Sequence, residues 1–215
     1  RRIMAKIYLV RHAESIANVQ GIYQGQTYDT DLSKRGVMQA QALAQHFQYI
    51  PISRVIASPL KRTLQTATIV AFNKHLPVQL ESQIIETNHG EWEGKHKDVI
   101  KKTWPWIYKK WTKFPSSTKF PQGEHFLETQ KRVLEWWQQF CQAVTVDTLV
   151  VSHDNIIRII VARVLNRKLN KIWKFHLQPT AITEVSVIHD KITLASLGDS
   201  KHLGELGVDL SMHAL

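Results

Sequence analysis

The sequence predicts an α/β fold with three layers in the order α/β/α, a mostly parallel central sheet and helices on both of its faces. Two observations predict this fold. Three short apolar runs, Lys6–Val10, Arg54–Ala57 and Thr148–Val151, are typical of buried strands. Each run is followed by a helical pattern rather than by a tight hairpin, which is the order of elements in parallel sheets.

Length and composition favour one globular domain. The chain has 215 residues, and single domains commonly have ~100–200, so residues 1–215 are treated as one domain. Hydrophobic residues make up 43% of the chain and charged residues 21%, which argues against disorder. No apolar run approaches the ~20 residues that cross a bilayer, and the N-terminal apolar stretch is too short for a secretory signal. With Cys141 as its single cysteine, the protein is expected in the cytoplasm, away from membranes.

Helix caps and apolar periodicity place the helices. Ser33 can cap a helix with the inward stripe Val37, Ala40, Leu43, Ala44 and Phe47. Pro59 suits the first turn of a second helix with the stripe Leu60, Leu64, Ala67, Val70 and Ala71. Asn155–Leu165 is apolar nearly all round, which predicts a deeply packed helix. Glu124–Ala143 predicts a longer helix whose bulk comes from Phe126, Val133, Trp136, Trp137 and Phe140.

Two further segments complete the expected fold. The runs Glu184–Ile188 and Lys191–Ala195 flank His189-Asp190, which predicts a hairpin added to the rim of the sheet. Residues 95–122 are rich in Lys, Trp and Pro, which predicts an inserted lid or small helical cap.

Most of the excess positive charge lies in that insertion. The chain has a formal net charge of +10. Between residues 95 and 119, eight lysines stand against the single acid Asp98, so these lysines can attract an anionic compound from a distance. The aromatic residues there fit either the core of a cap or the wall of a substrate pocket: Trp104, Trp106, Tyr108 and Trp111. Interleaved Lys and Trp also suit single-stranded nucleic acid, but that reading explains none of the site residues below, and no nucleic-acid partner is expected.

Charged and titratable residues follow the three predicted strands. Arg11 and His12 come directly after the first, Arg62 lies one turn beyond the second, and His153 follows the third. Ligands of an open parallel sheet bind beyond the carboxyl ends of its strands, so these side chains should converge. Two arginines and two histidines call for an anion, and a phosphate monoester offers oxygen pairs that a guanidinium group matches. The helix that begins near Asn155 would add backbone donors.

Two histidines at a phosphate can divide the work. A neutral imidazole can accept the phosphoryl group, while a cationic one steadies the transferring oxygens. A carboxylic acid would protonate the departing alkoxide. The residue pattern leaves Glu86, Glu91 and Glu93 open as candidates for that acid. The other histidines lack a metal-ligand spacing, so neither a metal nor a cofactor is expected.

Six sequence blocks carry a resemblance to a known family. They are LVRHAES with Asn18, YQG, DLSKRGVMQA, SPLKRTLQTA, ETNHGEWEG and VVSHDNIIR, and they occur in this order between Ile7 and about Ser196. The chain resembles the histidine phosphatase superfamily, which includes the cofactor-dependent phosphoglycerate mutases. The short chain and the YQG block look more like the phosphatase branch.

The resemblance implies roles for individual residues. His12 would be the phosphate-accepting nucleophile, and Glu86 the proton donor. The remaining phosphate pocket and its mouth would consist of Arg11, Arg62, His153, Asn18, Gln24 and Gly25. No metal is implied by this chemistry.

Three positions depart from the family pattern. Ala13 replaces a glycine beside the nucleophile, and Ile85 replaces an arginine often found before the acid. Asp154 replaces the glycine next to His153 and would repel phosphate if it pointed inward. We expect Asp154 to cap the following helix instead. An inward carboxylate should raise the pKa of His153 and penalise dianionic substrates.

The resemblance implies a phosphomonoester hydrolase that acts through a phosphohistidine on a small phosphorylated metabolite. Two alternatives stay open. One is a phosphoglycerate mutase, and the other is a catalytically silent member that binds a phosphorylated ligand, with Asp154 as the disabling change. The sequence identifies neither the physiological substrate nor the oligomeric state. A homodimer is one of the open alternatives.

Overall fold

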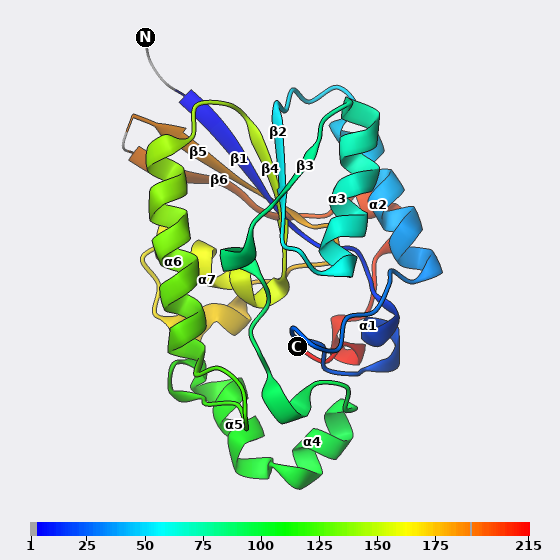
Figure 1. Cartoon of the computed structure of the whole chain (residues 1–215), viewed down its shortest axis with the longest axis vertical. Helices are drawn as coiled ribbons and strands as arrows, with labels where there is room; N and C mark the ends of the chain where they lie inside the picture. The colour runs from blue at the N-terminus through cyan, green and yellow to red at the C-terminus, as the bar shows by residue number, and fades with distance from the viewer. Residues whose placement is uncertain (1–3, 190) are drawn as a thin grey trace.

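A six-stranded sheet forms the centre of the molecule (Figure 1). The computed structural model describes residues 4–189 and 191–215. The strands lie in the order β3-β2-β4-β1-β5-β6. Their bounds are β1 Met4–Arg11, β2 Arg54–Ala57, β3 Val78–Leu80, β4 Thr148–Ser152, β5 Ile182–Ile188 and β6 Lys191–Asp199. The three strands predicted from apolar runs are all present, with β1 and β4 slightly longer than expected.

Strands β1, β4, β2 and β3 are parallel, as predicted. Their register pairs Arg11 with Ser152 and Ala57 with Val151, so the three site-bearing strands end at one edge of the sheet. Strand β5 runs antiparallel to β1, and β6 runs antiparallel to β5, which confirms the hairpin at the rim. The predicted turn of this hairpin was His189-Asp190, and Asp190 lies outside the described residues.

Alternate side chains of the strands pack into two separate hydrophobic cores, because successive residues of a strand point to opposite faces of the sheet. Ile7 and Leu9 of β1 pack with the core under helices α6 (Phe126–Ala143) and α7 (Asp154–Val164). Tyr8 and Val10 pack on the other face, under α2 (Lys34–Phe47) and α3 (Lys61–Lys74). Helices therefore cover both faces, which is the predicted three-layer arrangement (Figure 1).

The remaining helical elements connect the layers. They are α1 (Ile16–Gln20), α4 (Lys97–Thr103), α5 (Pro105–Lys113) and the short 3₁₀ turns Ser82–Ile84, Gly90–Trp92, Pro115–Ser117, Leu169–Lys174, Lys201–Leu206 and Leu210–Met212. In the part of the chain that the structure describes, none of the helices has the length and apolarity needed to span a membrane.

Several predicted boundaries differ from the structure. Ser33 caps α2 as expected, its side chain accepting from the backbone N–H of Gly36. Helix α3 begins at Lys61 with Leu60 as its N-cap, so Pro59 lies before the helix rather than in its first turn. Val37 was predicted to face the core but is 38% exposed. Strand β3 was not predicted, because only three residues of it pair and it lies at the edge of the sheet.

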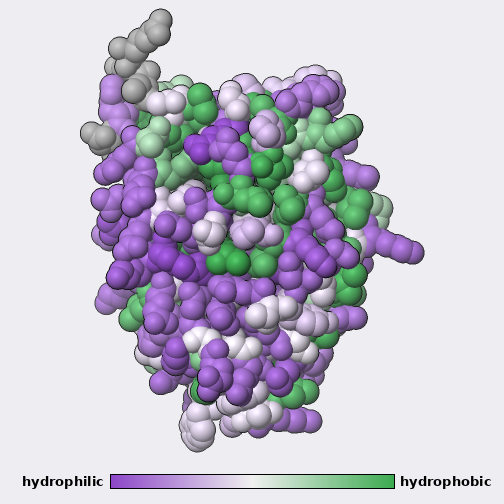
Figure 2. All heavy atoms as spheres, viewed as in Figure 1, coloured by the Kyte–Doolittle hydropathy of each residue, from purple (hydrophilic) through white to green (hydrophobic). Residues whose placement is uncertain are grey.

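The segment 95–122 is helical, as predicted, and is anchored by aromatic packing. Trp111 and Phe120 are fully buried, with their ring centroids 5.0 Å apart. Phe120 also packs edge-to-face against Trp92 at 5.1 Å, which joins the segment to the body of the molecule. Trp106, in contrast, is 79% exposed. Figure 2 shows a largely hydrophilic surface at the end of the molecule where α4 and α5 lie.

We expect Phe120→Ala to destabilise the protein by about 3–5 kcal/mol, because truncation of a fully buried phenylalanine removes apolar burial and leaves a cavity. Urea unfolding followed by tryptophan fluorescence measures the change. The matched control is Phe114→Ala in the same segment, where the ring is 56% exposed and the effect should stay within about 0.5 kcal/mol. Equal losses for the two variants would contradict this account of the anchor.

Candidate active site

His12 and His153 lie together at the carboxyl edge of the sheet. Their ring centroids are 5.4 Å apart, with the rings inclined at 62°. His12 Nδ1 lies 2.7 Å from the carbonyl oxygen of Ala13. Because a carbonyl oxygen can only accept, Nδ1 carries the hydrogen and Nε2 keeps its lone pair. His153 Nε2 contacts the hydroxyl of Ser58 at 2.7 Å, which fixes the second ring.

Two buried arginines flank the histidines, and backbone carbonyls hold both of them. Arg11 is the last residue of β1 and donates to Leu177 O at 2.8 Å. Arg62, in the first turn of α3, donates to Gly25 O at 3.0 Å and forms an ion pair with Asp29 at 3.0 Å. Each arginine is only 1% exposed. Their charges are therefore fixed in place inside the protein.

Arg11, His12 and Arg62 line a small cavity of about 30 Å³, which is too small for a whole substrate, and His153 lies behind its lining residues. The cavity is lined by Arg11, His12, Asn18, Tyr23, Gln24, Gly25, Arg62, Glu86, His89, Asp154, Asn155, Ala214 and Leu215. The Nε atoms of Arg11 and Arg62 and Nδ1 of His153 are buried without a hydrogen-bond partner. Buried polar atoms of this kind are costly unless a ligand or water pairs with them.

Burial and the two arginines together lower the pKa of both histidines. Burial holds the pKa of His12 well below its usual range, and the positive charges of Arg62 and Arg11 lower it further. Burial and then Arg62 lower the pKa of His153 in the same way. These directions favour two neutral rings, whereas one cationic histidine was expected. The two guanidinium groups supply the positive charge of the site instead.

Glu86 lies in the same cavity, whereas the other two candidate acids do not. Burial raises the pKa of Glu86, although its Oε1 accepts from the backbone N–H of Thr87 at 2.7 Å. Glu93 instead accepts from the backbone N–H groups of Gln26 and His89, both at 3.0 Å. Glu91 is exposed. A buried carboxyl group with a raised pKa keeps its proton nearer neutrality than a solvated one does.

Arg132 of α6 holds the segment that carries Glu86. Its Nη1 donates to the carbonyl oxygens of Gln83 and Ile85, both at 2.7 Å, and its Nη2 donates to Glu86 O at 3.0 Å. The same guanidinium group pairs with Glu124 at 2.9 Å. Ile85 stands where the family pattern often has an arginine. Its carbonyl oxygen is bound by an arginine from a helix that is distant in the sequence.

The predicted mouth residues also lie at the cavity. The side-chain oxygen of Asn18 accepts from Ser15 N at 3.0 Å, which leaves its amide NH₂ as the donor for a ligand. Gln24 donates from Nε2 to Ser15 Oγ at 2.8 Å. Gly25 has a φ of 126°, and a Cβ at this position would lie 2.1 Å from Glu93 Oε1. Only glycine fits there.

Asp154 does not cap α7, contrary to expectation. It is the first residue of the helix, and His153 is the N-cap. The carboxylate is buried, and its Oδ2 accepts from Arg158 Nε at 2.6 Å. Arg158 also donates to the carbonyl oxygens of Ile172, at 2.6 Å, and Phe175. The net pKa of His153 is lowered, because burial and then the charge of Arg62 determine it.

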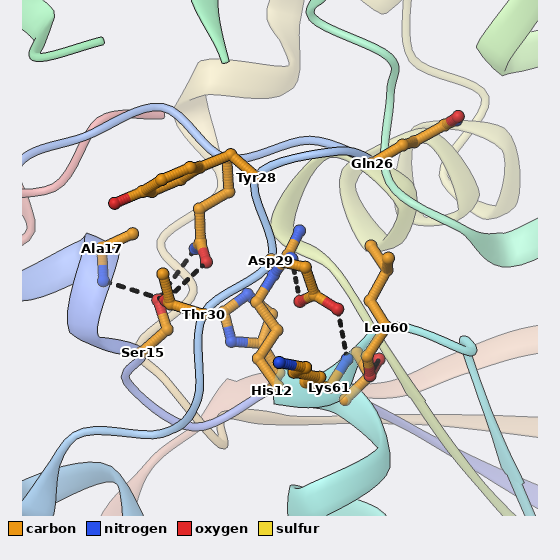
Figure 3. A network of polar contacts seen from close by, with 12 residues as sticks. His12, Ser15, Ala17, Gln26, Tyr28, Asp29, Thr30, Leu60 and Lys61 are labelled. Carbon is orange, nitrogen blue, oxygen red and sulfur yellow. Dashed lines mark hydrogen bonds and ion pairs between the residues drawn. The ribbon is translucent and has the colours of Figure 1, made fainter. Parts of the chain in front are cut away.

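Three residues of the site were missed by the sequence analysis. Asp29 binds Arg62 and also accepts from the backbone N–H of Lys61 at 2.7 Å, as Figure 3 shows beside His12. His89 lines the cavity, and both of its ring nitrogens are buried and unpaired. Ser58, the residue after strand β2, orients His153. The interactions of Asp29 and Ser58 join residues far apart in the sequence, so no local pattern marks them.

The last described residues cover the cavity. The hydroxyl group of Tyr23 donates to Leu215 O at 2.5 Å, and Trp111 Nε1 donates to the same oxygen at 3.2 Å. His213 Nδ1 contacts Arg11 Nη2 at 3.2 Å. Of the aromatic residues considered as pocket walls, Trp111 contributes only through this bond, and none of them is in contact with the cavity itself.

The doubly covered sheet and the buried cationic pocket at its carboxyl edge define an α/β protein built to bind a phosphate-like anion. Comparisons with known proteins agree. The model of the histidine phosphatase superfamily (branch 1) matches residues 7–200. Phosphoserine phosphatase 1 of Hydrogenobacter thermophilus is 34% identical over 207 residues, covering 96% of this chain and 98% of that protein.

Two other relatives carry different names. The α-ribazole phosphatase structure from Shigella flexneri has a TM-score of 0.82 at 26% identity, covering 90% of this chain and 96% of that one. A 2,3-bisphosphoglycerate-dependent phosphoglycerate mutase of Lactobacillus johnsonii is 28% identical, covering 76% of this chain and 84% of that protein. The chain belongs to the histidine phosphatase superfamily and is an enzyme of the phosphoglycerate mutase-like type.

The buried histidines predict how stability depends on pH. Burial lowers the pKa of His89 from 6.5 to about 4. Between these values the unfolded chain binds a proton that the folded protein does not, so the free energy of unfolding falls as the pH drops from 6.5 to 4. One such group contributes up to ~1.4 kcal/mol per pH unit.

We expect His89→Gln to make the free energy of unfolding less sensitive to pH between pH 5 and 7, as measured by urea titration. His75→Asn, at an exposed histidine, is the control and should keep the wild-type dependence. An unchanged pH dependence in His89→Gln would show that His89 binds its proton in the folded state as readily as in the unfolded chain.

Proposed function

We propose that this protein is a phosphomonoester hydrolase that acts on a small phosphorylated metabolite through a phosphohistidine at His12. One observation carries the proposal: the bond from His12 Nδ1 to Ala13 O, 2.7 Å long, leaves Nε2 with a free lone pair in a cavity lined by two arginines. A neutral imidazole held in this way is a nucleophile for phosphorus.

We also propose that the protein acts in the cytoplasm. Its buried Cys141 is a free thiol, which is in keeping with a reducing environment.

The arginines supply the clamp for the phosphoryl group. Each has a buried Nε atom without a hydrogen-bond partner, so phosphate oxygens would pair with donors that otherwise lack acceptors. A dianion bound there would also offset the desolvation of both charges. The backbone at the start of α7, next to His153, adds donors on the same side.

Glu86 is the residue that we assign to proton transfer. It lines the cavity, and burial together with the negative charge of Asp154 raises its pKa, against the influence of Arg62. A protonated Glu86 would donate to the leaving oxygen as His12 takes the phosphoryl group. The resulting carboxylate would then activate the water that releases phosphate from His12.

The mutase alternative differs from hydrolysis in returning the phosphoryl group to a bound intermediate instead of to water. The relative with 34% identity is named a phosphatase rather than a mutase. Hydrolysis is therefore the better supported reaction. O-phosphoserine, after that relative, is the first metabolite to test.

We expect the wild-type protein to hydrolyse p-nitrophenyl phosphate and His12→Ala to lose at least about 10³-fold in kcat, since the phosphoryl acceptor is removed. Release of p-nitrophenol measures both rates, and His75→Asn should retain the wild-type rate. Phosphate binding without hydrolysis by the wild type would favour the silent binder. Isomerisation of 3-phosphoglycerate in the presence of 2,3-bisphosphoglycerate would favour the mutase.

Arg132 provides a separate test of the role of Glu86. Since Arg132 holds the backbone of residues 83–86, we expect Arg132→Gln to misplace the acid without changing the phosphate clamp. Alkyl phosphates need a proton on the leaving oxygen, whereas p-nitrophenolate leaves without one. The variant should lose roughly tenfold or more in kcat on an alkyl phosphate and distinctly less on p-nitrophenyl phosphate.

The control for this test is Lys131→Gln, at the exposed neighbouring position on α6, which should leave both rates unchanged. Equal losses on the two substrates in Arg132→Gln would mean that Arg132 supports the fold in general rather than the position of the acid.

A further inference from the structure

We propose that Asp154 binds an ammonium group of the substrate, so that the enzyme selects phosphomonoesters that carry an amine close to the phosphate. The inference deepens the proposed function and rests on it. Asp154 lines the same cavity as His12 and Arg11 and is only 3% exposed. An acidic side chain inside a phosphate pocket repels phosphate unless a positive group lies beside it.

The two oxygens of the carboxylate have different surroundings. Oδ2 accepts from Arg158 Nε at 2.6 Å. Arg158 is itself held by the carbonyl oxygens of Ile172 and Phe175, so the carboxylate cannot turn freely. Oδ1 is buried without a hydrogen-bond partner. Arg11 Nη1 lies 4.0 Å from Oδ1, which is beyond hydrogen-bond distance.

A buried carboxylate oxygen that lacks a donor is costly, so the cavity is incomplete until a donor enters it. Water could supply the hydrogen bond but not the charge. An ammonium group supplies both, because it has three donors, no acceptor and a positive charge.

The charge of the cavity points to the same ligand. Among its lining residues, Arg11 and Arg62 are positive and Asp154 is negative, while the lining histidines His12 and His89 are neutral and Glu86 is the proposed protonated acid. The balance is one positive charge, against the −1.5 to −2 of a phosphate monoester near neutral pH. A substrate that also carries an ammonium group brings its own compensating charge to the negative side of this site.

A matched pair of ligands isolates the ammonium group. O-phospho-L-serine and the L enantiomer of 3-phosphoglycerate share the configuration at C2 and carry the same carboxylate and phosphate. They differ in one substituent, an ammonium in the first and a hydroxyl in the second. The probe protein is His12→Ala, which binds without turnover. Isothermal titration calorimetry of both ligands then measures a preference that does not depend on catalysis.

We expect His12→Ala to bind O-phospho-L-serine at least about tenfold more tightly than the L enantiomer of 3-phosphoglycerate, as a charge-assisted hydrogen bond provides. Adding Asp154→Asn should reduce this ratio to about threefold or less. Asp98→Asn, which removes an exposed carboxylate on α4, is the control and should keep the ratio. The ratio of the two affinities is the readout, so a general weakening of phosphate binding does not affect it.

Loss of the carboxylate leaves Arg158 buried and unpaired, which can unfold the protein. The second variant is therefore Asp154→Asn with Arg158→Met, and circular dichroism checks the fold of each protein. Equal affinities for the two ligands in His12→Ala, or a preference that survives in a folded Asp154→Asn variant, would overturn the ammonium site. Failure of the wild type to hydrolyse any phosphomonoester, with the binding preference intact, would instead overturn the proposed function alone.

Discussion

The confinement of two guanidinium groups beneath the protein surface is the constraint on which the rest of the site depends. Arg11 and Arg62 are almost fully buried, and burial of a charge is costly unless it is paired and hydrogen-bonded. Backbone carbonyls and the carboxylates of Asp29 and Asp154 meet part of that demand. The unpaired Nε atoms leave the rest to a bound anion. Burial lowers the pKa of both neighbouring histidines and the same two charges lower it further, so the buried arginines also favour the neutral form of His12 that the proposed mechanism needs.

The sequence analysis predicted the features that depend on local pattern. Apolar runs and helix periodicity located β1, β2 and β4, and the residues at their ends, Arg11, His12 and His153, do lie together. Contacts between distant segments could not be predicted from local sequence. Nothing near Arg132 in the sequence indicates that the Arg132 guanidinium group binds the backbone of residues 83–86. Asp154 was misjudged although a signal existed. Asp154 and Arg158 are four residues apart on the predicted helix, which is the spacing of an ion pair.

A second layer of charged residues joins the cavity to the helices around it. Arg132 and Glu124 tie the segment of Glu86 to α6, and Arg158 ties Asp154 to the turn Leu169–Lys174. Arg132 and Arg158 each bond to backbone oxygens as well as to a carboxylate. Bonds of this kind constrain both partners, because a displaced guanidinium group would leave several acceptors unpaired. The chemistry-bearing side chains are therefore positioned by long-range contacts rather than by the short loops that carry them.

The aromatic anchor of the 95–122 segment extends to the wall of the cavity. Tyr23 and His89, which line that wall, pack edge-to-face on Trp92 and Phe120, and these two rings hold the segment in place. The phosphate-gripping residues come from other parts of the chain. Substitutions in this segment can thus reshape the cavity wall through Tyr23 and His89 without altering the arginines and histidines at the ends of the strands.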